Sequence, residues 1–179
     1  RPYQLEGRNW LHSRISSGFG CILADDMGLG KTRQILAAID ALREEGSLES
    51  PVLILVPTSV ISSWANEAAR CFPQLRTCML RASHQRNPLA WDEISQSNIV
   101  ITSDTLFRMD HLLWDNHSLS GLVIDEAQVL KNPRTMLYRS VKELHVPWRI
   151  CMSGTPIENS LEDLWSLMSL SVPGLLSTH

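Results

Sequence analysis

The chain has 179 residues, of which 44% are hydrophobic and 20% are charged, a composition that excludes a disordered or fibrous protein and suits one globular domain. Its formal net charge is −3 and its isoelectric point is about 6.1, so there is no overall basic field for nucleic acid and any such contact has to be local. Apolar runs stay below about 18 residues, so neither a membrane span nor a membrane partner is expected.

The cysteines and the N-terminus suggest a piece of a longer intracellular protein. No two of the four cysteines form a C-x-x-C pair, which argues against a zinc site. Cys21 and Cys151 lie in apolar, strand-like runs, where reduced and buried thiols are expected. The chain has no initiator Met and no signal-peptide pattern at its N-terminus.

Helical patterns and short apolar strands alternate along the chain, which predicts an α/β domain with a mainly parallel sheet flanked by helices. In the first helix, Leu5, Trp10, Leu11 and Ile15 are expected on one face, and Ser59 is a candidate helix N-cap. No linker or repeat divides the chain, so residues 1–179 are expected to form a single domain. In chain order, we expect a helix over residues 4–15, a strand over 20–24, a helix over 31–45, a strand over 52–56, a helix from 59 to 69, a weak strand over 76–80, a short helix over 88–94, a strand over 98–102, a helix over 103–109, a strand over 122–124, a helix over 134–144, a strand over 149–152 and a helix over 161–170.

Polar residues follow five of the predicted strands directly. In an open parallel sheet, ligands bind at the edge formed by the carboxyl ends of the strands. These side chains are therefore expected to gather at one binding edge. They are Asp25, Asp26, Thr58, Ser59, Ser103, Asp125, Glu126, Ser153 and Thr155.

The segment between the first predicted strand and the second predicted helix has the character of a phosphate-binding loop. Gly28 and Gly30 let the backbone wrap an anion, and Lys31 and Thr32 follow where the helix begins. Backbone N–H groups and the helix dipole would attract phosphate there, Lys31 would reach the β- and γ-phosphates, and Thr32 would bind Mg²⁺. The complete pattern has glycine where this chain has Asp25, so a chance turn before a core helix is the alternative.

Two further strand ends carry residues suited to phosphate chemistry. At the end of the fifth strand, Asp125 can hold Mg²⁺ and Glu126 can orient and deprotonate a water, although an Asp there can equally cap a helix. Ser153-Gly154-Thr155-Pro156 can sense the γ-phosphate, or it is an ordinary turn. Gln4 can hydrogen-bond an adenine edge through its amide, or it is simply a surface residue. Trp64, Trp91, Trp114 and Trp165 are expected to pack within the fold, with base stacking as the alternative.

Taken together, these motifs strongly resemble the first RecA-like lobe of SWI/SNF-type, superfamily-two DNA translocases, over nearly the whole chain. The sequence of motif III, residues 153–159, is similar to that of bacterial and archaeal members. In this family an acidic pair at positions 25 and 26 is normal. The matching segments are Arg1-Pro2-Tyr3-Gln4 with Gly7 and Trp10-Leu11 (adenine recognition), residues 23–34 (motif I), 55–64 (Ia), 101–106 (Ib), 125–128 with Lys131-Asn132 (II), 153–159 (III) and 161–167.

The resemblance implies a three-layer RecA-like fold that binds ATP, Mg²⁺ and the phosphates of one strand of double-stranded DNA. It implies these roles: catalysis by Lys31, Asp125 and Glu126; nucleotide binding by Gln4, Asp26, Met27, Gly28, Leu29, Gly30, Lys31, Thr32 and Gln34; metal binding by Thr32 and Asp125; DNA binding by Thr58, Ser59, Ser103, Thr105 and Lys131; and coupling by Gln128, Ser153, Gly154 and Thr155.

Two departures from the family pattern affect what is expected. Gln128 stands where the family usually has His, which bears on coupling and not on ATP binding. A second RecA-like lobe of the same polypeptide, with its arginine fingers, would follow this chain, so this lobe alone should hydrolyse ATP poorly. A strand-separating helicase and a non-hydrolysing ATP-binding module are the alternatives. The location would be cytoplasmic, near the nucleoid, in a prokaryote and nuclear in a eukaryote.

Overall fold

The computed structural model describes residues 1–26, 28–82, 90–114, 117–156 and 161–176. The elements alternate between helix and strand almost throughout, as the apolar pattern predicts. In chain order they are α1 (Pro2–Ser16), β1 (Cys21–Leu23), α2 (Lys31–Glu44), β2 (Val52–Val56), the 3₁₀ turn η1 (Thr58–Val60), α3 (Ile61–Cys71), β3 (Thr77–Met79), α4 (Ala90–Gln96), β4 (Ile99–Ser103), α5 (Asp104–Met109), α6 (His111–Trp114), β5 (Gly121–Ile124), the 3₁₀ turn η3 (Ala127–Leu130), α7 (Met136–Glu143), β6 (Arg149–Met152) and α8 (Leu161–Ser171).

The six strands form one sheet in the order β1-β6-β5-β2-β4-β3, and every pairing is parallel. Strands β2, β4, β5 and β6 are buried along their full length, which explains why their sequences are continuously apolar and not alternating. The prediction of an α/β fold with a parallel sheet is therefore confirmed.

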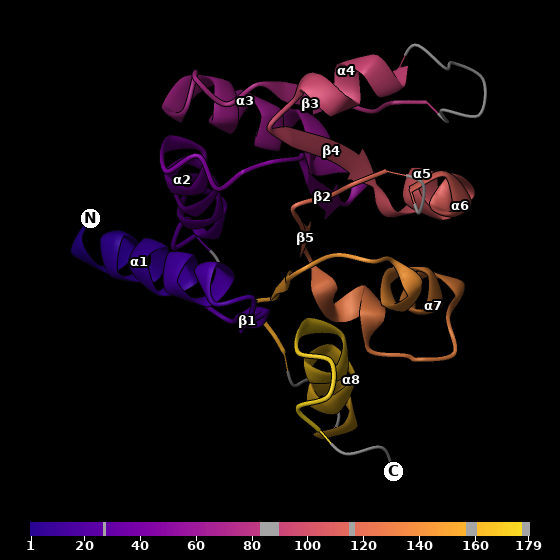
Figure 1. Ribbon diagram of the computed structural model, residues 1–179. Coiled ribbons are helices and arrows are strands. Elements are labelled where there is room, and N and C mark those ends of the chain that lie inside the picture. The colour runs from indigo at the N-terminus through magenta and orange to yellow at the C-terminus, as the bar shows by residue number, and fades with distance from the viewer. Residues whose placement is uncertain (27, 83–89, 115–116, 157–160, 177–179) are drawn as a thin grey trace.

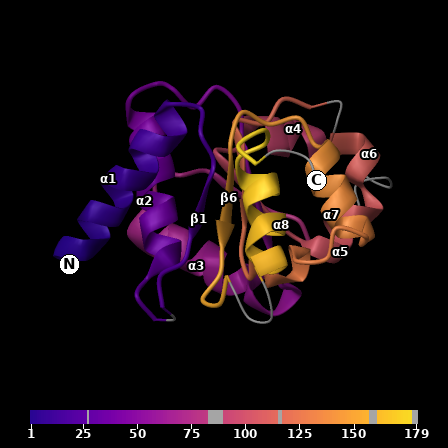
Figure 2. The ribbon, with the colours of Figure 1, turned by 90° about the horizontal axis from the view of Figure 1, so that it is seen from below.

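Helices cover both faces of the sheet, and the three layers can be followed in Figures 1 and 2, with α1, α2 and α3 on one side and α4 to α8 on the other. Each side has its own apolar cluster. The first cluster includes Ile35 and Ile39 of α2 and Trp64 of α3; the second includes Phe107 of α5 and Leu167 of α8. Helices thus cover both faces of the sheet, which leaves the ends of the strands as the place for a binding site.

The strand register places the predicted polar residues along one edge of the sheet. Leu23 pairs with Met152, Ile124 with both Leu55 and Cys151, and Val56 with Ser103. The residues that follow these pairs are the ones that the sequence assigns to phosphate, metal and DNA. The expected gathering of polar residues at one edge is therefore present, and this edge runs from the end of β1 to the end of β4.

Several local predictions were wrong. Leu5 and Trp10 are 60% and 42% exposed, and only Leu11 and Ile15 of the first helix are buried, because α1 touches the fold along a narrower stripe than the expected face. Ser59 does not cap α3, because the turn η1 comes first and Val60 stands at the N-cap. The short elements α6 and η3 were not expected. Within the described residues, no helix combines the length and the apolar character needed to cross a membrane.

Three of the four cysteines are buried free thiols, and we expect them to be unreactive in the folded protein. Burial raises the pKa of Cys21 and of Cys78 to about 12 and that of Cys151 to about 11, and the thiolate is the reactive form. Cys71 is partly exposed. A thiol-reactive dye should therefore label Cys71 alone within minutes and the other three only after denaturation. Rapid labelling of Cys151 in the native protein would contradict this packing.

Candidate active site

The loop between β1 and α2 has the backbone that anion binding requires. Gly28 and Gly30 have φ angles of 82° and 79°, a left-handed conformation that residues with a Cβ adopt only at a cost. Gly30 is the N-cap of α2, whose first residue is Lys31, and no side chain caps this helix. The N-terminal N–H groups of a 14-residue helix are thus left for an external acceptor.

Side chains fix the shape of this loop from within. The Lys31 ammonium donates to the carbonyl oxygens of Asp25 at 2.7 Å and Asp26 at 3.2 Å. The buried Gln34 amide donates to the Asp25 carboxylate at 2.9 Å. Asp25 therefore has a structural use in place of the missing glycine: it ties the start of the loop to the second turn of α2. Met27 lies outside the described residues.

Asp125 and Glu126 follow β5 and face the loop. The Asp125 carboxylate accepts from the indole N–H of Trp64 at 2.8 Å and from the backbone N–H of Glu126 at 3.0 Å. Burial raises the pKa of Asp125, and these two hydrogen bonds oppose that shift. Glu126 has a φ of 49° and is the only non-glycine residue in the described part of the chain with a positive φ. Such strain is characteristic of functional positions.

A chain of hydrogen bonds runs from Glu126 to the end of β6. The Gln128 amide nitrogen donates to the Glu126 carboxylate at 2.6 Å, and the Gln128 amide oxygen accepts from the Ser153 hydroxyl at 3.2 Å. The backbone N–H of Thr155 in turn donates to the Ser153 hydroxyl at 3.1 Å. An amide has both a donor and an acceptor, so Gln128 can bond both neighbours.

A cavity of about 620 Å³ gathers the predicted nucleotide-site residues that the structure brings together: Gln4, Gly28, Gly30, Lys31, Thr32, Asp125 and Glu126. Gln4 also donates to the Leu29 carbonyl at 3.3 Å, which joins α1 to the loop. Gln34 and Leu29 lie outside this cavity and line a neighbouring one, and Asp26 contributes its carbonyl to Lys31. An ammonium group, a hydroxyl, a carboxylate and free helix N–H groups around one cavity fit a nucleotide with Mg²⁺, which prefers oxygen ligands.

The predicted DNA-binding residues fall into two groups. Thr58, Ser59 and Thr105 are exposed at the ends of β2 and β4. Ser103 is only 2% exposed and its hydroxyl caps α5 by accepting from the Leu106 N–H at 3.2 Å. Lys131 is mostly buried, forms an ion pair with Asp163 at 3.4 Å and donates to the Thr155 carbonyl at 3.0 Å. The structure therefore gives Ser103 and Lys131 internal contacts. The exposed Thr58, Ser59 and Thr105 are better placed for an external ligand.

Sequence reasoning missed two contacts around the cavity. Trp64, expected only to pack, bonds Asp125, and Glu67 pairs with Arg33 at 2.6 Å, where both line the cavity. The sequence held one signal for them: Trp64 and Glu67 are three residues apart and therefore share a helix face. Nothing in it pointed across the sheet to Asp125.

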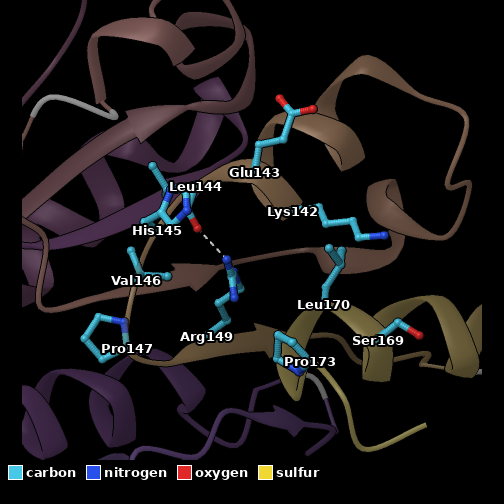
Figure 3. Close-up of a pocket in the computed structure, with 10 residues that line it drawn as sticks. All are labelled: Lys142, Glu143, Leu144, His145, Val146, Pro147, Arg149, Ser169, Leu170 and Pro173. Atoms are coloured by element: carbon cyan, nitrogen blue, oxygen red, sulfur yellow. Dashed lines mark hydrogen bonds between the residues drawn. The ribbon is translucent and has the colours of Figure 1, made fainter. Parts of the chain in front are cut away.

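A second pocket, of about 520 Å³, lies near the start of β6, at the edge of the sheet opposite the phosphate loop (Figure 3). The C-terminal ends of α7 and α8 flank this pocket. Its buried Arg149 donates to the carbonyl of Leu144, the C-cap of α7, as the dashed line in Figure 3 marks. Burial lowers the pKa of Arg149. The guanidinium closes the end of a helix, and this pocket lies far from the strand ends that carry the phosphate loop.

Comparisons with known proteins agree with this geometry. A family model described as the SNF2-related domain matches residues 3–179. Over its full length the chain is 31% identical to the "Chromatin-remodeling ATPase INO80" of Candida glabrata and 33% identical to that of Cryptococcus neoformans var. neoformans, of which it covers only 13% and 11%.

Solved structures of an archaeal protein are similar in both sequence and fold. The Sulfolobus solfataricus SWI2/SNF2 ATPase core in complex with dsDNA matches 99% of this chain with a TM-score of 0.88 and 37% identity, and this chain covers 36% of it. The core domain of the same name matches with a TM-score of 0.86 and 38% identity. The chain belongs to the SNF2-related domain family, as a first ATPase lobe of the SWI2/SNF2 type.

Proposed function

We propose that residues 1–179 form one domain, the N-terminal, ATP-binding lobe of an ATP-driven double-stranded DNA translocase. The observation that carries the proposal is the continuous set of contacts at one sheet edge, which runs from the Lys31 loop through Asp125 and Glu126 to Ser153 and Thr155. A site built only to hold a nucleotide has no need of the hydrogen-bonded chain beyond Glu126. That chain supports a role in which the state of the nucleotide is passed on.

In this proposal the loop holds the phosphates of ATP. Lys31 and the N–H groups at the start of α2 bind the β- and γ-phosphates, and Gln4 contacts the adenine edge. Thr32 and Asp125 would hold Mg²⁺, which neutralises charge on the phosphates when bound. The two hydrogen bonds that Asp125 accepts fix its carboxylate before any ligand arrives, so little reorganisation is needed on binding.

Glu126 is the proposed general base. Its strained backbone aims the carboxylate from the end of β5 toward the cavity that Lys31 and Thr32 line, and it can take a proton from the water that attacks the γ-phosphorus. The Gln128 amide holds one of its oxygens. When the charge at Glu126 changes, the Gln128–Ser153 bond and the turn at Gly154 and Thr155 respond, which would carry the signal toward a second lobe of the same polypeptide.

A second lobe would also complete the chemistry. An arginine finger from another domain is worth about 10³–10⁵-fold in comparable phosphoryl transfers. The cavity already contains Arg1 and Arg33, but Arg33 is paired with Glu67. Residues 1–179 alone should therefore bind ATP and hydrolyse it very slowly.

Double-stranded DNA is the proposed track, held by backbone contacts at the exposed hydroxyls of Thr58, Ser59 and Thr105. These groups lie beside one another because Val56 pairs with Ser103. Hydroxyl groups and backbone N–H groups at such turns hold phosphates without reading sequence. The archaeal core with the same fold was solved with dsDNA, which supports this choice of nucleic acid.

The test of this function is the ATPase rate of the full-length protein with different nucleic acids. Duplex DNA of any sequence should raise the rate sharply, and single-stranded RNA should not. A response to single-stranded RNA alone would favour the helicase alternative. Tight ATP binding with no turnover under any condition would favour the regulatory module.

Replacing Thr58 or Ser59 by Ala should weaken duplex binding a few-fold and equally for all sequences, because each variant loses one phosphate contact. Ser103→Ala is the matched control. It should leave DNA binding nearly unchanged and lower the free energy of unfolding by about 1 kcal/mol, because it removes the cap of a helix. Filter or fluorescence binding on two unrelated duplexes, with urea unfolding, checks both. A sequence-dependent loss, or a DNA defect confined to Ser103→Ala, would contradict the assignment.

A further inference from the structure

Helix α3 connects the proposed DNA-contact turn to the nucleotide site. The turn η1, which carries Thr58 and Ser59, leads directly into α3 at Ile61. Thr58 also lines a small cavity of about 190 Å³ together with Asp125 and Glu126. A displacement of the turn therefore acts on one end of an 11-residue helix whose Trp64 contacts Asp125.

Trp64 forms the contact between this helix and Asp125. Its side chain is 2% exposed, and its indole N–H donates to one Asp125 carboxylate oxygen at 2.8 Å. The other carboxylate oxygen accepts from the Glu126 backbone. A hydrogen bond to an ionised acceptor is short and strong, and indole has only this one donor. The orientation of the carboxylate is thus set by α3 on one side and by the Glu126 backbone on the other.

Glu67 forms a second contact from the same face of α3, one turn further along. Its carboxylate pairs at 2.6 Å with Arg33, which directly follows Thr32 at the start of α2. The helix therefore touches both halves of the nucleotide site: Trp64 reaches the strand that carries Asp125, and Glu67 reaches the helix that follows the phosphate loop. No other described element bonds both halves through side chains in this way.

We propose that Trp64 is a positioning residue that sets the orientation of the Asp125 carboxylate for Mg²⁺ and passes displacement of the DNA-contact turn, residues 58–60, to that carboxylate. The proposal rests on the proposed function and extends it to a residue outside the phosphate loop and the Asp125-Glu126 pair. DNA that presses on Thr58 and Ser59 would shift α3 and with it the Asp125 oxygen that Trp64 holds. ATP hydrolysis would in this way depend on DNA through a single hydrogen bond across the sheet edge.

The competing explanation is that Trp64 only fills the core and satisfies its own N–H. Two substitutions separate these roles. Trp64→Phe keeps a large apolar ring and loses the donor, whereas Trp64→His keeps a ring N–H donor and loses more apolar surface. If packing alone matters, Trp64→His is the worse variant in every measurement. If the hydrogen bond matters, Trp64→Phe requires more Mg²⁺ than Trp64→His does. Trp64→His is still the less stable of the two proteins.

The experiment measures the Mg²⁺ concentration for half-maximal binding of a fluorescent, non-hydrolysable ATP analogue to the full-length protein. Loss of a residue that orients a metal ligand typically weakens metal binding about 10–100-fold, so Trp64→Phe should raise this concentration by that factor, with Trp64→His in between. Binding of the analogue in EDTA and duplex binding should stay unchanged. Stimulation of ATP hydrolysis by duplex DNA should fall toward none.

Trp91→Phe is the matched control. It makes the same change in α4, where Trp91 stacks on His117, and it should behave as wild type.

The outcomes distinguish this inference from the function on which it rests. A folded Trp64→Phe protein with the wild-type Mg²⁺ requirement and full DNA stimulation overturns it while the ATPase assignment stands. If Trp64→Phe does not fold, Trp64→His decides in the same way. If the wild-type protein shows no Mg²⁺-dependent binding of the analogue at all, the proposed function itself has failed.

Discussion

Glu126→Gln in the full-length protein should lower the ATPase rate by about 10²–10⁴-fold, the usual contribution of a general base, and leave ATP binding intact. Gln has the shape of Glu and keeps an oxygen for the 2.6 Å hydrogen bond from Gln128, so the chain of contacts to Ser153 survives. Only the ability to accept a proton is removed. Single-turnover hydrolysis and equilibrium binding of ATP measure the two properties separately.

Glu143→Gln is the control for this substitution, because Glu143 is exposed at the end of α7, away from the cavity. It should hydrolyse ATP at the wild-type rate. Retained turnover in Glu126→Gln would show that another group activates the water. A parallel loss of ATP affinity would instead point to damage to the strained backbone at Glu126.

Gly20→Ala should lower the free energy of unfolding by about 2–3 kcal/mol, near the upper end for insertion of one methyl into a packed region. A Cβ at Gly20 would overlap two backbone carbonyl oxygens, those of Ser171 and Arg149. Neither can rotate away, because Arg149 begins β6 and Ser171 ends α8. The three chain segments therefore meet at a distance that only glycine allows.

The matched control is Ser17→Ala, three residues earlier and exposed, which should change the free energy of unfolding by less than about 0.5 kcal/mol. Urea denaturation followed by circular dichroism gives both values. An unchanged midpoint for Gly20→Ala would mean that the backbones of β6 and α8 can separate without cost.

The strands, and the polar edge at which they end, were predictable because their signals are local. A run such as residues 52–56 has no polar residue to expose, so it has to be a buried strand, and polar residues after such strands have to meet at one edge. The phosphate loop was predictable for the same reason, since two glycines and Lys31-Thr32 between a strand and a helix have few other uses.

Contacts between distant side chains were not predictable. Ser103 stands at the expected edge, and its hydroxyl caps α5. The sequence did not reveal this cap, because a helix cap and a phosphate contact call for the same residue type at the same place. Trp64 has the spacing of a core residue and is one, yet its N–H reaches Asp125. Leu5 and Trp10 lie on the predicted helix, but the width of the contact with the rest of the fold leaves them outside it. The partner and the exposure of such a side chain depend on elements that are far away in the sequence.

The place of β1 at the end of the sheet affects how the protein is made. In the described sheet β1 pairs only with β6, and Cys21 lies opposite Ile150. During synthesis the strand that leads into the phosphate loop therefore leaves the ribosome long before its partner exists, and closing so long a loop is slow and entropically costly. The nascent chain can assemble its middle strands first, but it gains a seated nucleotide loop only when nearly all of the lobe has been translated. We therefore expect ATP binding to begin only after β6 has been synthesised and has paired with β1.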